Sequence, residues 1–290
     1  MEMPAIHRLR LATGLSCQFL EWAPSDPACE HTVVLVHGFL DLAWGFRPLV
    51  EAGLAGRYHI VAPDLRGHGD SDPVGPGGYY HFLDYLADLA SLFDEIGRSR
   101  VSVVGHSMGG NIAGYFAGSF PKRLHKLVIM EGLGPPEPPL DPGPRIAHWI
   151  ADWQGVRGKT PKQYADLAAA TARLRISDPL LDEAMARALA EVATRVDERG
   201  GRRFKHDPLH VTSGPHSFRL DFAEALWRRV ACPLLFVEGA LSMMRLADEE
   251  TARRLSCFHD ARRVVLDGAG HMMQRHQPAA LARVLIDFLG

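Results

Sequence analysis

A serine in a turn framed by glycines is the first residue whose setting suggests chemistry. Residues 101–109 read as a short apolar strand that runs into Gly105-His106-Ser107-Met108-Gly109, and a helical pattern follows. Such a sharp turn pushes a serine hydroxyl out of a sheet, and the glycines leave room for its strained backbone. The positive end of the following helix favours negative charge beside the hydroxyl. This context predicts that Ser107 is a nucleophile; a glycine-rich turn with an incidental serine is the alternative.

A serine hydroxyl is a poor nucleophile until a base removes its proton. The chain has 15 histidines, so an imidazole somewhere in it proves little. His271 is distinguished by its position, because it follows the last expected strand and precedes the final helix. Loops at the carboxyl ends of parallel strands meet at one edge of a sheet. We therefore predict that His271 is the base; a histidine on an ordinary surface loop is the alternative.

The loop that begins at His37 offers a place for the negative oxygen that acyl transfer creates. This oxygen needs hydrogen-bond donors that are already in position. The backbone N–H of Met108 is one donor that we expect, and the N–H of Phe39 is the second. We expect His37 to brace this loop by hydrogen bonds. Asp64 and Arg66, which follow the next expected strand, should also brace loops rather than catalyse.

Six short apolar runs predict strands that are buried on both faces, as in a parallel sheet. The runs are Thr32–Val36, His59–Ala62, Val101–Val104, Leu127–Met130, Leu234–Val237 and Arg263–Leu266. Helical patterns occur at Phe82–Ile96, Asn111–Phe120 and Ala279–Phe288. The alternation predicts an α/β fold with a doubly wound, mostly parallel sheet. Two early segments, near Ile6–Leu11 and Cys17–Trp22, predict a leading hairpin.

The alternation of strands and helices stops after Met130. Six prolines between residues 135 and 144 predict a stiff, extended connection. Helical patterns without strands follow, one beginning at Thr160 as a capping residue and another running from Asp178 to about Arg195. The strand pattern returns only at Pro233. We therefore expect a core domain made of residues 1–133 and 228–290, with residues 134–227 inserted as a helical cap.

Composition excludes several classes of function. The net charge of -2 gives no reason to expect a surface that binds nucleic acid. The four cysteines are scattered and form no CxxC pair, so neither a zinc site nor a redox pair is indicated. No apolar stretch is long enough to span a bilayer, and the charged N-terminus does not resemble a secretory signal. We expect a cytoplasmic protein without stable membrane insertion.

The nucleophile turn, the two loops after the first buried strands and the histidine loop occur in an order that resembles the α/β-hydrolase fold. In particular, they resemble the branch that contains capped esterases, epoxide hydrolases and haloalkane dehalogenases. The resemblance covers nearly the whole chain, and only the inserted cap lacks a pattern specific to this family. Members carry Ser, Asp or Cys in the nucleophile turn. Ser107 argues against epoxide hydrolase and dehalogenase chemistry, because both of these use an aspartate nucleophile.

The sequence departs from this family in the acid that should orient the histidine. Most members place an Asp a few residues beyond the strand before the last, and here Ser242 stands at that position. Some relatives instead place the acid at the end of the strand after the nucleophile helix, where this chain has Glu131. We favour Glu131 as the acid, with Glu238 as the second candidate and Asp248 as a distant third. A strand-end carboxylate that only caps a loop is the alternative for Glu131.

The substrate should bind between the sheet and the cap. Candidates for the wall of this pocket are Trp149, Trp153, Met243, Met244, Met272 and Met273. Such side chains more often simply fill a core, but around a pocket they would favour an apolar acyl or aryl group.

These features predict a serine hydrolase that cleaves a carboxylic ester of a small or medium apolar substrate through an acyl-enzyme. We expect no metal or organic cofactor, and a small-molecule ester as the substrate; the sequence leaves the oligomeric state open. A lactonase or a hydrolase of carbon–carbon bonds in diketones could use the same residues, because a fold does not fix a reaction. A ligand-binding protein without catalysis is the alternative from another class.

Overall fold

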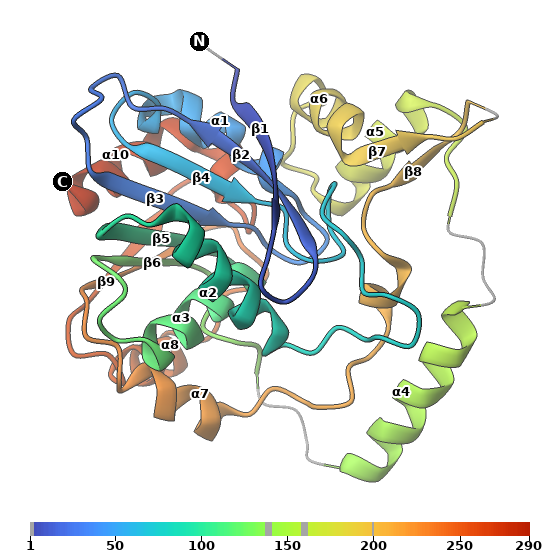
Figure 1. Ribbon diagram of the computed structural model, residues 1–290. Coiled ribbons are helices and arrows are strands. Elements are labelled where there is room, and N and C mark those ends of the chain that lie inside the picture. Colours follow the sequence, from blue (N-terminus) through green and yellow to red (C-terminus); the bar gives the residue numbers. More distant parts are fainter. Residues whose placement is uncertain (1–2, 137–140, 158–161, 199) are drawn as a thin grey trace.

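The chain folds around an eight-stranded sheet (Figure 1). The computed structural model describes residues 3–136, 141–157, 162–198 and 200–290. The strand order is β1-β2-β4-β3-β5-β6-β9-β10, in which β1–β2 and β2–β4 are antiparallel and the other neighbours parallel. The strands are β1 (Ala5–Arg10), β2 (Ser16–Trp22), β3 (His31–Val36), β4 (His59–Pro63), β5 (Arg100–His106), β6 (Leu127–Met130), β9 (Leu234–Gly239) and β10 (Ala261–Leu266).

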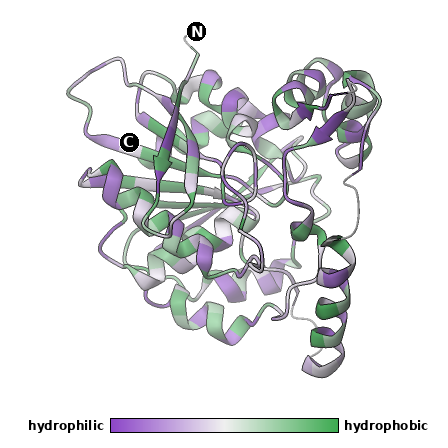
Figure 2. Cartoon of the chain, turned by 45° about the vertical axis from the view of Figure 1, so that its right-hand side comes forward, coloured by the Kyte–Doolittle hydropathy of each residue, from purple (hydrophilic) through white to green (hydrophobic). Residues whose placement is uncertain are grey.

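All six predicted strands and the leading hairpin are present, so the predicted doubly wound sheet is confirmed. The apolar runs predict the parallel strands because β3 and its parallel neighbours are covered on both faces, which requires apolar residues at successive positions. Alternate residues of β3 point into different cores, with Val34 and Val36 in one and Val33 and Leu35 in the other. In Figure 2 the central strands are coloured mostly as hydrophobic.

Helices cover both faces of the sheet (Figure 1). One face carries α2 (Asp84–Ile96), α3 (Met108–Ser119), α7 (Leu220–Trp227) and α8 (Asp248–Leu255). The other face carries α1 (Arg47–Leu49) with its flanking turns η1 (Ala43–Phe46) and η2 (Val50–Leu54), α9 (Met273–His276) and α10 (Pro278–Leu289). The helices predicted from sequence correspond to α2, α3 and α10. Within the described residues, no helix combines the length and apolar character needed to cross a bilayer.

The segment between β6 and α7 projects from the carboxyl edge of the sheet (Figure 1). Its elements are α4 (Pro142–Arg157), α5 (Leu167–Ser177), α6 (Glu183–Ala193), β7 (Thr194–Val196), β8 (Arg202–Phe204) and η3 (Pro208–Val211). The prediction of helices alone was wrong, because β7 and β8 pair as a small antiparallel sheet.

Of the two helix starts predicted in this segment, one was misplaced. The predicted start at Thr160 lies outside the described residues, and α5 begins only after Asp166, whose carboxylate accepts from the N–H of Ala169 at 2.8 Å. The second helix, α6, begins after Asp182 rather than at Asp178, because Asp182 accepts from the N–H of Met185 at 2.9 Å. Each of these aspartates satisfies a free donor at the helix end, which favours the observed starts.

A close backbone contact fixes the start of α3 against the end of β3. An added Cβ on Gly109 would lie 2.2 Å from the carbonyl oxygen of Val36, and one on Gly105 would lie 2.4 Å from that of Gly109. Both distances are too short for any side chain, so only glycine allows the two segments to approach this closely. The turn between β5 and α3 is therefore held at the carboxyl end of β3.

Replacing Gly109 with alanine should lower the free energy of unfolding by about 3 kcal/mol, because the methyl group would force α3 away from β3. Urea denaturation of the purified variant measures this change. Gly75→Ala is the matched control, since nothing lies within 4 Å of a Cβ at that glycine. It should change stability by no more than about 0.5 kcal/mol. Equal stability of the Gly109 variant and wild type would contradict the close contact.

Candidate active site

Ser107 occupies a strained backbone position between β5 and α3. Its φ of 52° and ψ of -116° are rarely adopted by residues other than glycine. Hydrogen bonds hold this conformation: the Ser107 N–H donates to the carbonyl of Met130 at 2.8 Å, and the Ser107 carbonyl accepts from Gly110 and Asn111. The strain is thus supported from β6 and from the first turn of α3, as is common at functional sites.

His271 is oriented by hydrogen bonds at its ring and at its backbone. Its Nδ1 lies 2.6 Å from Oε2 of Glu131, and its carbonyl oxygen lies 2.8 Å from Nε2 of His106. Because His106 precedes Ser107 directly, this second bond connects the loop that carries His271 to the turn that carries Ser107. A proton on Nδ1, shared with the carboxylate, leaves the lone pair on Nε2. Among the described residues, none forms a hydrogen bond with that nitrogen.

Glu131 is a buried carboxylate that receives hydrogen bonds from three residues. Besides His271, the backbone N–H of Gly239 donates at 2.8 Å and the hydroxyl of Ser242 donates at 2.7 Å. Burial alone would raise the pKa of Glu131, but the hydrogen bonds from His271, Ser242 and Gly239 outweigh it and lower the pKa. The group is therefore ionised at neutral pH. Sequence reasoning missed the role of Ser242, although a hydroxyl at the usual position of the acid was a visible signal.

The two other carboxylates considered as the acid are bound elsewhere. Glu238 is fully buried and accepts from the guanidinium of Arg263 at 2.8 Å and from Arg245 at 3.2 Å. Asp248 pairs with the same two arginines at the protein surface. In the part of the chain that the structure describes, neither carboxylate forms a hydrogen bond with His271. The geometry therefore brings Glu131, and not these two, to the imidazole.

The loop after β3 passes beside Ser107. An added Cβ on Gly38 would lie 3.2 Å from the Cβ of Ser107. As expected, His37 braces this loop: its Nδ1 bonds to the carbonyl of Gly38 at 2.8 Å, and its Nε2 accepts from the N–H of Leu65 at 2.9 Å. In the described part of the chain, the N–H groups of Phe39 and Met108 donate to no protein atom, which leaves both available for an oxyanion.

A buried ion pair joins the loop after β3 to the segment after His271. Asp41, whose N–H donates to the carbonyl of Gly38, pairs with Arg275 of α9. Both side chains are almost fully buried. Burial alone would raise the pKa of Asp41, but the charge of Arg275 outweighs it and holds the pKa below its usual value. The loops that carry Phe39 and His271 are thus fixed to one another.

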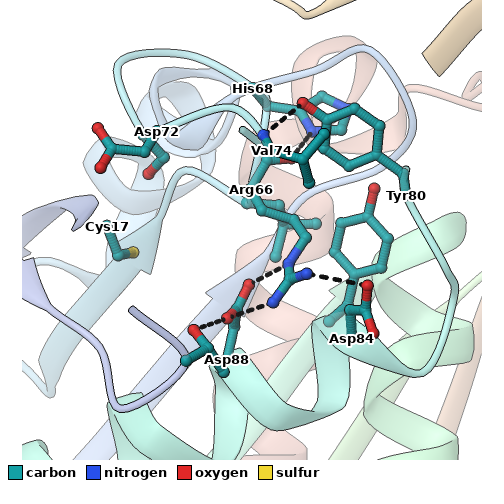
Figure 3. A network of polar contacts seen from close by, with 12 residues as sticks. Cys17, Arg66, His68, Asp72, Val74, Tyr80, Asp84 and Asp88 are labelled. Carbon is teal, nitrogen blue, oxygen red and sulfur yellow. Dashed lines mark hydrogen bonds and ion pairs between the residues drawn. The ribbon is translucent and has the colours of Figure 1, made fainter. Parts of the chain in front are cut away.

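Asp64 and Arg66 brace loops, as predicted. The carboxylate of Asp64 accepts from the N–H of Ala43 at 2.8 Å and from that of Asp70 at 2.9 Å. The guanidinium of Arg66 lies between Asp88 and Asp84 at the start of α2 (Figure 3), with bonds of 2.6 and 2.7 Å to Asp88 and 3.0 Å to Asp84. Both residues are buried, and within the described residues neither forms a hydrogen bond with Ser107 or His271.

The structure does not bring the predicted pocket residues together. Trp149 and Trp153 stack on each other at 5.2 Å and line a cavity of about 450 Å³ beside Tyr79, which Ser107 and His271 do not line. Met243 is 96% exposed and Met244 61% exposed. Met273 is fully buried in the core, and Met272 follows His271 directly. Residue type alone could not tell which cavity each tryptophan lines. Within the described ranges, no group of three or more His, Cys, Asp or Glu side chains could hold a metal ion.

Comparisons with known proteins agree with this architecture. A model of the "Alpha/beta hydrolase family" matches residues 33–284. A "serine hydrolase-like protein" from Danio rerio is 26% identical over 276 residues, which cover 92% of this chain and 83% of that protein. The solved structure of a hypothetical protein from Pseudomonas aeruginosa superimposes with a TM-score of 0.85 at 26% identity, over 99% of each chain.

A more distant structure extends the likeness of fold. A thioesterase domain from the curacin biosynthetic pathway has a TM-score of 0.84 and 24% identity, over 98% of this chain and 100% of that domain. At this level of identity the likeness concerns the fold alone.

The burial of His106 predicts that the protein loses stability in mild acid. Burial and the neighbouring His271 lower the pKa of His106 to about 3, whereas a free imidazole titrates near 6.5. Between these values the unfolded chain binds the additional proton, so stability should fall as the pH drops from about 6.5 toward 3. His106 alone should contribute up to about 1.4 kcal/mol per pH unit in this window.

Urea denaturation at several pH values between 4.5 and 7.5 measures this slope. His106→Gln keeps an amide donor but cannot titrate, so its stability should depend less steeply on pH. His31 and His210, whose pKa values burial lowers to about 4, should maintain part of the slope. Exposed His259 provides the control, and His259→Gln should leave the slope unchanged. An equally steep slope in the His106 variant would contradict a neutral, buried His106.

Proposed function

The chain belongs to the alpha/beta hydrolase family, and on that premise we propose that it is a serine hydrolase that cleaves a carboxylic ester through an acyl-enzyme. The observation that carries this proposal is the 2.6 Å contact between Glu131 and Nδ1 of His271, on a loop bonded to the nucleophile turn by His106. An imidazole held in this way presents a basic nitrogen, which is what a serine nucleophile requires. The similarity to a serine hydrolase-like protein supports the same assignment.

Acylation begins when Nε2 of His271 takes the proton of the Ser107 hydroxyl as its oxygen attacks the ester carbonyl. The carbonyl electrons move onto the oxygen, which accepts hydrogen bonds from the N–H groups of Phe39 and Met108. When these electrons return, the bond to the alcohol breaks, and His271 donates its proton to the departing oxygen. The products of this step are the free alcohol and an ester of Ser107.

Deacylation repeats the sequence with water as the nucleophile. His271 removes a proton from water, the hydroxide adds to the acyl carbon, and the Ser107 oxygen leaves with the proton from His271. Glu131 stabilises the positive imidazolium in both steps and keeps its proton on Nδ1. Ser242 and the N–H of Gly239 keep the carboxylate ionised and in place.

Two apolar side chains on the loop beside Ser107 favour a substrate with an apolar acyl group. Phe39 is 47% exposed and Leu40 37% exposed, on the loop that passes beside Ser107. Covering exposed apolar surface of this kind with a hydrophobic group removes it from water and lowers the free energy. Residues 134–227 form the cap in this proposal, which encloses the substrate from the carboxyl edge of the sheet. The substrate is then a small or medium ester.

Replacing Ser107 with alanine should abolish hydrolysis, with a loss on the order of a millionfold, because no other group can form the acyl-enzyme. A panel of ester, lactone, amide and diketone substrates measures activity, and a fluorophosphonate probe measures covalent labelling. Wild type should label and prefer esters, whereas the variant should not label. A wild type that resists the probe would favour the non-catalytic binding protein, and cleavage of only lactones or diketones would reassign the substrate.

The acid can be identified by comparing Glu131→Gln with Glu238→Gln. The first change removes the charge that stabilises imidazolium and should lower kcat by about ten-thousandfold. The second leaves the imidazole untouched and should retain most of the activity. Adding Ser242→Asp to Glu131→Gln should recover part of the loss, because Ser242 lies within hydrogen-bond distance of Glu131. The opposite ranking of the single variants would exclude Glu131 as the acid.

A further inference from the structure

The loop that carries His271 is held by a residue of the inserted segment. The imidazole of His276, in α9, lies between this loop and the segment. Its Nδ1 accepts from the N–H of Gly270 at 3.0 Å, and its Nε2 lies 2.9 and 3.0 Å from the two carboxylate oxygens of Asp178. Asp178 follows α5 in the segment that projects over the carboxyl edge of the sheet. A continuous chain of hydrogen bonds thus runs from the insertion to the residue before His271.

This connection is buried and closely packed. The side chain of His276 is only 4% exposed and that of Asp178 15% exposed. Leu180, two residues after Asp178, packs on the same loop, since an added Cβ on Gly270 would lie 2.9 Å from its Cδ1. Hydrogen bonds shielded from water are stronger than exposed ones, and their loss leaves unpaired groups behind. The insertion therefore contacts the loop through both a polar and an apolar side chain.

We propose that Asp178 and His276 are positioning residues that use the insertion to hold the catalytic base in place. The inference rests on the proposed function, in which His271 is that base. Asp178 acts by selecting the tautomer of His276: its carboxylate binds a proton on Nε2, so Nδ1 stays free to accept from Gly270. Without the carboxylate, a proton on Nδ1 would face the N–H of Gly270 and repel it. Asp178 and His276 thus form one unit, and neither touches the reacting atoms.

The insertion then affects chemistry as well as access to the site. A displacement of about 1 Å at a catalytic group can cost on the order of a hundredfold in rate. Releasing Gly270 would move His271 relative to Ser107 while leaving the surface around Phe39 unchanged. The expected effect is therefore on kcat, with little change in KM.

The test compares Asp178→Ala, Asp178→Asn and His276→Ala in the full chain. Asp178→Ala and His276→Ala should each lower kcat about 30-fold with KM changed by less than about threefold. The double alanine variant should be no slower than the slower single variant, because the two residues act together. Asp178→Asn keeps an oxygen that can accept from Nε2 and should retain at least about a third of the activity.

Asp182→Ala is the matched control, because Asp182 accepts the N-terminal hydrogen bond of α6 and, in the described part of the chain, forms none with the loop that carries His271. It should lower the melting temperature without lowering kcat. Hydrogen-exchange NMR provides a readout independent of turnover: the Gly270 amide should exchange at least about tenfold faster in Asp178→Ala than in wild type or Asp182→Ala. Wild-type kcat in Asp178→Ala, unchanged exchange at Gly270, or equal losses in the Asp178 and Asp182 variants would each overturn the proposal.

Fluorophosphonate labelling separates this inference from the proposed function. Failure of the wild type to label would count against the serine hydrolase itself. Normal labelling of wild type together with an unchanged labelling rate in Asp178→Ala would leave the hydrolase standing and refute the positioning pair. A labelling rate that falls in Asp178→Ala and recovers in Asp178→Asn is the result that we expect.

Discussion

The site depends on one steric constraint, the contact of backbone against backbone where α3 begins beside β3. Because Gly109 has no Cβ, the first turn of α3 can lie directly against the carbonyl of Val36. This contact brings Ser107 next to the loop at Gly38 and keeps its backbone at a positive φ. The strained turn is stable because β5, β6 and α3 each supply part of its surroundings. A strained residue persists only when its neighbours fix it in this way.

Around this turn, the ionised side chains are stabilised by hydrogen bonds and charges from neighbouring residues. Glu131 is ionised in a buried place because hydrogen-bond donors surround it, and Asp41 is ionised because Arg275 lies against it. His106, which pairs with no carboxylate among the described residues, stays neutral and donates to the carbonyl of His271. Burial penalises each charged form, so every charge that remains here has a specific partner. These partners connect the three loops that meet at the carboxyl edge of the sheet.

The core was predictable because its signals are local and redundant. A strand such as Thr32–Val36 is apolar throughout, and only burial on both faces explains that pattern. In the segment between β6 and α7, Asp178 offered a capping signal, but Asp182 also offered one, and the sequence cannot rank competing caps. The short strands β7 and β8 contain arginines and show no alternation of apolar and polar residues, so their sequences did not predict strands. Which cavity Trp149 lines depends on how α4 packs, and residue type does not encode that.

The pairing of β6 with β9 has a consequence for how such chains are classified. Glu131 follows β6, and Ser242 follows β9, yet their side chains are 2.7 Å apart. Adjacent parallel strands end side by side, so a carboxylate from either one reaches the same point in space. A motif search that demands an aspartate at residue 242 would reject this chain, although Glu131 places a carboxylate at the same location. Searches that ask which residues can reach one location, rather than one alignment column, would retain it.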